Sequence, residues 1–230
     1  MRRFFAMAIA FAAPGFIFMG CASTSDSKPI DPPATQLAPA TQAATDADWK
    51  TLFDGKTLGN WKVTDFGGEG KVTIDNDSLI LTQCKSFTGI TWKGPLPSKM
   101  NYEIELDAQR VAGADFFCGL TFPVNNSYAS LIIGGEDVCG ISNLDGKDAA
   151  RDDAKRQHQF KNGTWYHIRI RVAGGRIIAW IDDKKMVDVE TVGQNVCPRP
   201  GVEKSEPFGI ASYQTTAAIR KVRIRKVPGN

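Results

Sequence analysis

Two stretches of the sequence alternate in a period of two residues between an apolar set and a largely polar set, and this alternation constrains the fold more than any other feature. Residues 102–107 read YEIELD, and residues 165–172 read WYHIRIRV. A period of two residues places one set of side chains on one face of a β-strand and the other set on the opposite face. Both stretches are therefore predicted to be strands with one buried face.

Similar runs and turns continue along the chain. Residues 176–182, RIIAWID, are joined by a polar turn to a second apolar run, which is typical of a hairpin. Further strands are predicted at 72–81, 116–122, 130–133, 208–213 and 219–227. Only the polar segment 147–159 has the character of a helical turn. Many short strands without alternating helices indicate an antiparallel sandwich or barrel.

The N-terminus has the layout of an exported lipoprotein. A basic pair precedes an apolar run over residues 4–18, so residues 1–20 are predicted to be a signal peptide. The segment FMGC, which ends at Cys21, resembles the lipobox of bacterial lipoproteins, with phenylalanine where leucine is usual. We therefore expect lipidation at Cys21 and export to the bacterial cell envelope. An ordinary secretory leader with a coincidental cysteine is the alternative.

Composition then divides the rest of the chain. Residues 21–47 are rich in Ala, Ser, Thr and Pro and lack aromatic residues, which predicts a flexible tether on the membrane. Residues 48–228 remain as one folded domain. Ala22, where an aspartate would stand for retention, favours the outer membrane. With 28 basic and 25 acidic residues, the chain offers no extended basic patch for nucleic acid.

Several motifs of this domain resemble those of one family. The opening WKTLFDGKTL at 49–58, the segment GADFFCGLTF at 113–122 and the closing IRKVRI at 219–224 follow the order of the 3-keto-disaccharide hydrolase domain family. The resemblance covers nearly all of 48–228. It implies an all-β fold, an antiparallel jelly-roll β-sandwich of the concanavalin A-like lectin/glucanase type.

Acidic residues are the leading catalytic candidates. Glu105 and Asp107 project from one face of their predicted strand about 6.5–7 Å apart, close to the carboxyl separation of ~6.5–9.5 Å in inverting glycosidases. Members of the family that resemble this sequence commonly carry an acid at the position of Asp107, which makes it the best single choice. The alternative is that these charges only mark the wet face of a strand. Glu136 is a third candidate, standing where the resemblance implies a sugar-stacking tryptophan.

Three residues of the central region are predicted to contact a saccharide. Asp115 and Cys118-Gly119 stand in for the Asn-Ser-Gly segment that many family members carry in this region, and Thr121 shares a strand face with Gly119, which leaves room for a ligand. A packing role for this glycine is the alternative. Trp92 is expected to be the most exposed tryptophan and hence a stacking surface.

Near the C-terminus, Tyr213 and Gln214 are predicted to hydrogen-bond the sugar, at a place where family members often carry a histidine. An arginine of the family is also missing, since Pro123 occupies its approximate position. His158 and His167 are the only histidines, and both are predicted to be solvated. Two histidines disfavour a multi-histidine metal site.

Cofactors and disulfides are left open by the sequence. No cofactor is predicted with certainty, although the carboxylates of Glu105, Asp107 and Glu136 could bind a divalent cation; no spacing establishes a metal site. Apart from Cys21, four cysteines remain, and in an exported domain they could pair in three ways. They are Cys84, Cys118, Cys139 and Cys197. Cys118, which lies among phenylalanines, can also be interpreted as a buried free thiol.

The resemblance implies a carbohydrate-active hydrolase that cleaves the glycosidic bond of a 3-keto-disaccharide or a related glucoside. Such a substrate can also react by elimination and hydration, because a ketone at C3 acidifies the proton on C2. The alternative from another class is a non-catalytic, lectin-like domain that binds a saccharide, which the missing arginine and histidine favour. A structural envelope lipoprotein without a small ligand is the third hypothesis.

Overall fold

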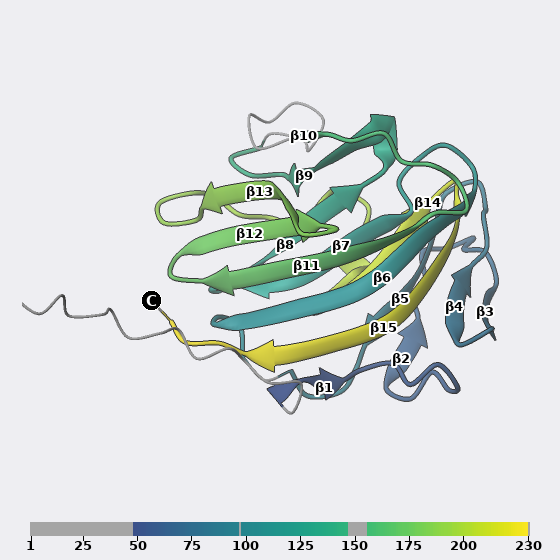
Figure 1. Cartoon of the computed structure of the whole chain (residues 1–230), viewed down its shortest axis with the longest axis horizontal. Helices are drawn as coiled ribbons and strands as arrows, with labels where there is room; N and C mark the ends of the chain where they lie inside the picture. The colour runs from purple at the N-terminus through teal and green to yellow at the C-terminus, as the bar shows by residue number, and fades with distance from the viewer. Residues whose placement is uncertain (1–47, 97, 147–155, 230) are drawn as a thin grey trace, which may run out of the picture. The chain divides into compact units, whose positions relative to one another are not determined.

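The computed structural model describes residues 48–96, 98–146 and 156–229. The predicted signal peptide 1–20, the lipid at Cys21 and the tether 21–47 lie outside these residues. Within them, the chain forms two antiparallel β-sheets that pack against each other, as Figure 1 shows. The predicted antiparallel β-sandwich is therefore confirmed. No helix in the described part of the chain is long and apolar enough to cross a membrane.

The first sheet has the order β13-β12-β11-β6-β15-β4-β3, and a short strand β1 also pairs with β15. Its strands are β1 (Lys50–Thr51), β3 (Val72–Asp75), β4 (Ser78–Leu81), β6 (Tyr102–Ala112), β11 (Trp165–Ala173), β12 (Arg176–Ile181), β13 (Lys184–Glu190) and β15 (Thr216–Lys226). The two alternating stretches of the sequence are neighbours here, because β6 pairs with β11 on one side and with β15 on the other. All of these pairings are antiparallel.

The second sheet has the order β10-β9-β8-β7-β14-β5-β2. Its strands are β2 (Trp61–Val63), β5 (Phe87–Trp92), β7 (Cys118–Val124), β8 (Ser127–Ile133), β9 (Val138–Ser142), β10 (Arg156–Gln157) and β14 (Gly209–Tyr213). Strand β10 corrects part of the sequence interpretation, which gave the segment 147–159 a helical turn. Its two residues pair with β9, and residues 147–155 lie outside the described part of the chain.

The core lies between the sheets and is built from the apolar half of each alternating strand. Leu106 of β6, Ile168 of β11 and Leu120 of β7 are all fully buried. The prediction of an exposed Trp92 is wrong, because only 3% of this residue is accessible. It packs edge-on against Trp61, with ring centroids 5.2 Å apart, and its strand turns this side chain toward the core. The aromatic ring therefore contributes to packing rather than to a surface.

One irregularity shapes the outer face of the first sheet. Between Arg220 and Arg223, β15 holds one residue more than the facing segment of β6, which is a β-bulge. Lys221 lies in this bulge with φ = 53°, in the left-handed region that few residues other than glycine adopt. Bulges of this kind re-aim side chains, and here Lys221 stays on the outer face beside its two arginine neighbours.

Candidate functional site

An acidic strand lies between two basic strands on the outer face of the first sheet. Each acidic residue of β6 has a basic residue opposite it on β11 and on β15. The sets are Glu103 with Arg171 and Arg225, Glu105 with Arg169 and Arg223, and Asp107 with His167 and Arg220. Charges of opposite sign directly across antiparallel strands stabilise the pairing. The acidic residues predicted as catalytic therefore lie on one face, but each is surrounded by cations.

Glu103 is the most deeply placed of the three acids, with 1% of the residue exposed. The guanidinium of Arg225 donates to its Oε2 from Nε at 2.8 Å and from Nη2 as well. Arg169 and Arg171 each approach the other carboxylate oxygen to 3.8 Å. Two donors from one guanidinium hold the carboxylate in position as well as neutralising its charge. Glu103 is thus a buried ionic link between three strands.

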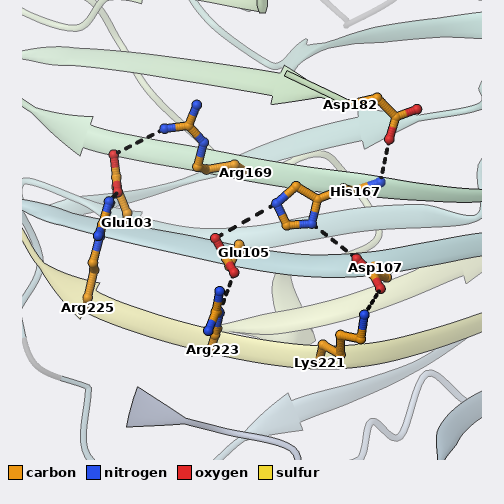
Figure 2. Close-up of polar contacts among 9 residues, drawn as sticks. All are labelled: Glu103, Glu105, Asp107, His167, Arg169, Asp182, Lys221, Arg223 and Arg225. Carbon is orange, nitrogen blue, oxygen red and sulfur yellow. Dashed lines mark hydrogen bonds and ion pairs between the residues drawn. The ribbon is translucent and has the colours of Figure 1, made fainter. Parts of the chain in front are cut away.

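Asp107 and His167 form a hydrogen-bonded pair. The imidazole Nδ1 lies 3.1 Å from Oδ1 of the carboxylate, and the backbone N–H of His167 donates to Asp182 at 2.8 Å. An ionised carboxylate only accepts, so Nδ1 carries a proton, and in the neutral imidazole Nε2 is the nitrogen without one. Nε2 lies 3.8 Å from Oε2 of Glu105. Figure 2 shows the ring between the two carboxylates.

The surroundings of this pair set its protonation. Burial raises the pKa of Asp107, but hydrogen bonds from His167, Lys221 and Arg220 outweigh burial and hold this pKa well below its usual range. The hydrogen bond to Asp107 raises the pKa of His167 above 6.5, against burial, and the charge of Glu105 adds to the increase. Asp107 is therefore ionised at neutral pH, and His167 is a stronger base than a free imidazole.

A hollow of about 400 Å³ opens beside this pair. We call it the first hollow; it is lined by Thr51, Phe53, Asp54, Glu105, Asp107, His167, Lys221, Val222 and Arg223. Its volume lies within the range of ligand pockets, about 300–1,000 Å³. Lys221 reaches Asp107 Oδ2 with Nζ at 3.1 Å, and 69% of its side chain is exposed. The hollow thus combines an imidazole, an exposed ammonium and carboxylates that are held by cationic side chains.

Four of the other predicted residues, Asp115, Glu136, Tyr213 and Gln214, gather at a different place, beside strands of the second sheet. Asp115 lies against the turn that carries Glu136, since a Cβ added at Gly135 would meet its Oδ1 at 3.1 Å. Its backbone N–H donates to Thr215 at 3.1 Å, next to Gln214. Glu136 itself is exposed in the 3₁₀ turn Gly135–Asp137. The structure therefore separates Glu136 from Glu105 and Asp107, which it keeps together.

Tyr213 and Gln214 belong to the same region as Asp115. Tyr213 stacks on Phe116, with ring centroids 5.9 Å apart, and its backbone N–H donates to the carbonyl of Phe116. Gln214 donates from Nε2 to the carbonyl of Lys85 at 3.0 Å and to the Tyr213 hydroxyl at 3.2 Å. We call the set of Asp115, Glu136, Tyr213 and Gln214 the second-sheet cluster.

Thr121 does not line a ligand space. The residue is fully buried, and its hydroxyl lies 3.3 Å from that of Ser130. The expected space at Gly119 is filled, because a Cβ there would meet the ring of Phe116 at 2.9 Å. Gly119 is small to admit this ring, so the packing alternative is correct.

The cysteines and the acids give no sign of a bound ion in the described residues. All four cysteines of this part are free thiols; burial raises the pKa of Cys118 to about 12, and Cys139 is also buried. No group of three or more His, Cys, Asp or Glu side chains among the described residues is arranged to hold a metal. Glu105 and Asp107 already bind cationic side chains, so they do not form a ligand set with Glu136.

Sequence reasoning did not single out His167 and Lys221 as candidate site residues. The alternation placed His167 on the solvated face, which is correct in part, since 40% of its side chain is exposed. Its partner is fixed by the register between β6 and β11, which one sequence does not reveal. Lys221 had a visible signal: the run RKV at 220–222 interrupts the alternation, and an interrupted alternation indicates a bulge.

Solved structures of other proteins share this architecture. A protein of unknown function with a galectin-like fold from Bacillus subtilis has a TM-score of 0.54 and 11% identity, over 75% of this chain and 91% of its own. A glycosyl hydrolase candidate from Parabacteroides distasonis has a TM-score of 0.52 and 14% identity, over 81% and 99%. The carbohydrate-binding module CBM66 from Bacillus subtilis has a TM-score of 0.50 and 14% identity, over 73% and 96%. At these identities the likeness shows the fold.

The fold and the charged outer face of the first sheet together define the class of this domain. It is an antiparallel β-sandwich of the galectin-like kind, with a charged hollow on one sheet. No curated protein matches the sequence significantly. The profile of a domain family described as 3-keto-alpha-glucoside-1,2-lyase-like does match, over residues 48–225. The chain belongs to this family, and the predicted resemblance is confirmed.

Proposed function

We propose that the domain cleaves 3-keto-glucosides by elimination, with His167 as the base. The observation that carries this proposal is the Asp107–His167 pair at the edge of the first hollow, with the Lys221 ammonium beside it. The description of the family as lyase-like supports the reaction class. The glycosyl hydrolase candidate and the carbohydrate-binding module of the same fold support a saccharide as the ligand.

The proposed reaction uses the acidity that the ketone gives to C2. Nε2 of His167 removes the C2 proton, and the electron pair of the C–H bond moves into an enolate on C3. The enolate collapses to the ketone, a double bond forms between C1 and C2, and the C1–O bond breaks. The leaving oxygen takes a proton from the Lys221 ammonium, and exchange with solvent restores both side chains. Lys221 and Arg223 are the cations beside the developing charge.

Asp107 acts through His167 in this proposal. Its lowered pKa leaves it without a proton at neutral pH, so it cannot be the general acid of a direct hydrolysis. It holds the imidazole with Nε2 free and stabilises the imidazolium that forms. Asp107 is therefore a positioning residue in this proposal, whereas the sequence-based hypothesis made it the leading catalytic candidate.

The raised pKa of His167 predicts the pH dependence of the reaction. The base must be neutral, so kcat/KM should rise with pH through an apparent pKa above 6.5 and then level off. Glu105→Gln should move this rise in kcat/KM to lower pH, because the charge of Glu105 contributes to the raised pKa of His167. Initial rates measured between pH 5 and 9 test this. A rate that falls with pH across the same range would mean that His167 acts as an acid instead.

The direct test of the proposed function is product analysis. The purified protein is incubated with 3-keto-disaccharides and with their unoxidised parents, with and without a chelator. We expect release of a monosaccharide together with an unsaturated 3-keto product, and only from the keto substrates. Incorporation of a solvent hydroxyl at C1 without an unsaturated intermediate would contradict elimination and support direct hydrolysis.

A lectin-like function is the second candidate, and one observation favours it. Every carboxylate of the acidic strand is already paired with arginine, lysine or histidine, so none is free to transfer a proton. A site of this kind can hold sugar hydroxyls without reacting. Saturable binding of a disaccharide without turnover of any keto sugar would establish this function.

A further inference from the structure

Three arginines surround one carboxylate at the end of the acidic strand that is farther from His167. Arg225 of β15 donates twice to Oε2 of Glu103, and Arg169 and Arg171 of β11 each lie 3.8 Å from its Oε1. Figure 2 shows Arg169 and Arg225 on opposite sides of Glu103. One negative charge faces three positive charges, so this group of side chains carries an excess of two positive charges.

The three arginines are bound to Glu103 with unequal strength. Arg225 holds the carboxylate with two hydrogen bonds, whereas the 3.8 Å contacts of Arg169 and Arg171 are longer than a hydrogen bond. Within the described part of the chain, neither of these two guanidiniums donates a hydrogen bond to another residue. Their side chains are 28% and 30% exposed, against 2% for Glu103. The buried carboxylate thus keeps two cations together at the surface, where their N–H donors are available.

Packing holds Arg169 in place without using its donors. The central carbon of its guanidinium lies 4.1 Å from the centre of the Trp180 ring on β12. A stacked guanidinium contacts the ring with its face, and its N–H donors lie in its plane. Because the side chain is already ordered, it loses less conformational entropy when it binds a ligand.

The carboxylates at neighbouring positions of the sheet have cations of their own. Glu105, the next acid on β6, is bound by Arg223. Asp188 of β13 is bound by Arg176 and by Lys185, each at 2.6 Å. Neither carboxylate therefore cancels the positive charge around Glu103.

The arrangement of the two guanidiniums suits an oxyanion. Side chains two residues apart on a strand share a face at a spacing of about 6.5–7 Å. The Nη1 atoms of Arg169 and Arg171 lie equally far from one oxygen, so a group with two or three oxygens above that point can accept from both. The donors of arginine match the oxygens of sulfate, phosphate and carboxylate groups, and the charge strengthens each bond. A neutral hydroxyl group gains none of this attraction.

We propose that Arg169 and Arg171 form an oxyanion-binding site on the outer face of the first sheet. Neither residue lines the first hollow, so the site is separate from the proposed base. Its ligand is a sulfate, phosphate or carboxylate group, either as a free ion or as a substituent of a saccharide. The saccharide as carrier rests on the proposed function, whereas the oxyanion rests on the arginines.

The test uses dextran sulfate and its neutral parent dextran as probes of the purified full-length protein. Calorimetry at low ionic strength should show saturable binding of dextran sulfate and no binding of dextran. The double variant Arg169→Gln with Arg171→Gln should weaken the binding of dextran sulfate about tenfold, since an exposed ion pair contributes about threefold. Arg171→Gln alone, which keeps the stack on Trp180, should weaken it about threefold. Thermal unfolding without ligand shows that each variant is folded.

A matched control removes the same charge from the second sheet. Lys62 of β2 and Lys93 are both exposed, and Lys62→Gln with Lys93→Gln should leave the affinity unchanged within about twofold. Equal weakening by the two double variants would mean that dextran sulfate is attracted by the overall positive charge, and it would overturn the site. No binding by the wild type, or unchanged affinity in both arginine variants, would also overturn it.

Competition then identifies the carrier of the oxyanion. Sodium sulfate and sodium chloride are added at equal ionic strength to the complex with dextran sulfate. Displacement by sulfate at concentrations where chloride has no effect would assign the site to the free ion, and equal displacement by the two salts would assign it to the group on a saccharide. No keto sugar enters these measurements, so failure of the proposed reaction would leave their result unchanged.

Discussion

Replacing His167 with glutamine should lower kcat/KM for a 3-keto-disaccharide by about 10²- to 10⁴-fold, the usual contribution of a general base. Glutamine retains an N–H for Asp107 but cannot accept a proton. The rise of kcat/KM with pH that reflects deprotonation of His167 should be absent from the residual activity. Folding should be little affected, because 40% of the side chain is exposed and Asp107 keeps its bonds to Arg220 and Lys221. Steady-state rates and thermal unfolding measure the two effects separately.

The second-sheet cluster provides the control for this variant. Glu136 lies in the turn between β8 and β9 and does not line the first hollow, so Glu136→Gln should leave kcat/KM unchanged within about twofold. The opposite pattern, in which Glu136→Gln abolishes turnover and His167→Gln does not, would place the reaction at the second-sheet cluster. That result would contradict catalysis at the first hollow.

The largest effect on stability is expected at the buried ion pair. Arg225→Met removes the two guanidinium hydrogen bonds to Glu103, whose side chain is only 2% exposed. The carboxylate then keeps only Arg169 and Arg171, each at 3.8 Å. Loss of one partner of a buried pair typically costs about 3–5 kcal/mol, and the retained arginines should hold the loss near 3 kcal/mol. Urea unfolding at pH 7 measures the change in the free energy of unfolding.

A second substitution shows whether the cost comes from the charge that is left behind. Glu103→Leu added to Arg225→Met removes the unpaired carboxylate, and apolar residues of similar size often replace a buried pair without loss. The double variant should therefore recover most of the stability. If it is as unstable as Arg225→Met alone, packing of the arginine stem and not the buried charge accounts for the effect.

The fold followed from the sequence because its signal is local. The alternation at 102–107 and 165–172 fixes which side chains are buried, and burial on one face is enough to define a half-buried strand. Short strands such as Lys50–Thr51 and Arg156–Gln157 were not predicted, since two residues carry no period. Trp92 was misjudged for a related reason: a single tryptophan shows its size but not the face of the strand on which it lies.

The site could be predicted only in part. The sequence identified Glu105 and Asp107 but not their partners, because these come from strands about 60 and 115 residues away and depend on register. Glu136 was grouped with these acids because it is acidic and stands where the resemblance implies a sugar-stacking tryptophan, and the fold places it in the turn between β8 and β9 of the second sheet. To predict Lys221 as a site residue would have required both the break in the alternation and its proximity to the loop 54–57. Only the tertiary structure brings that loop and Lys221 together.

The bulge in β15 also has a consequence for how such a surface arises. Without Lys221, the run from Arg220 would read RVRIR, an unbroken alternation that matches β6 position for position. One codon therefore separates the present strand from a regular one. Gain or loss of that codon would add or remove the amine while Val222, Ile224 and the arginines keep their faces. An amine at this surface can thus be acquired or discarded in one genetic step, with the alternation of the strand left as it was.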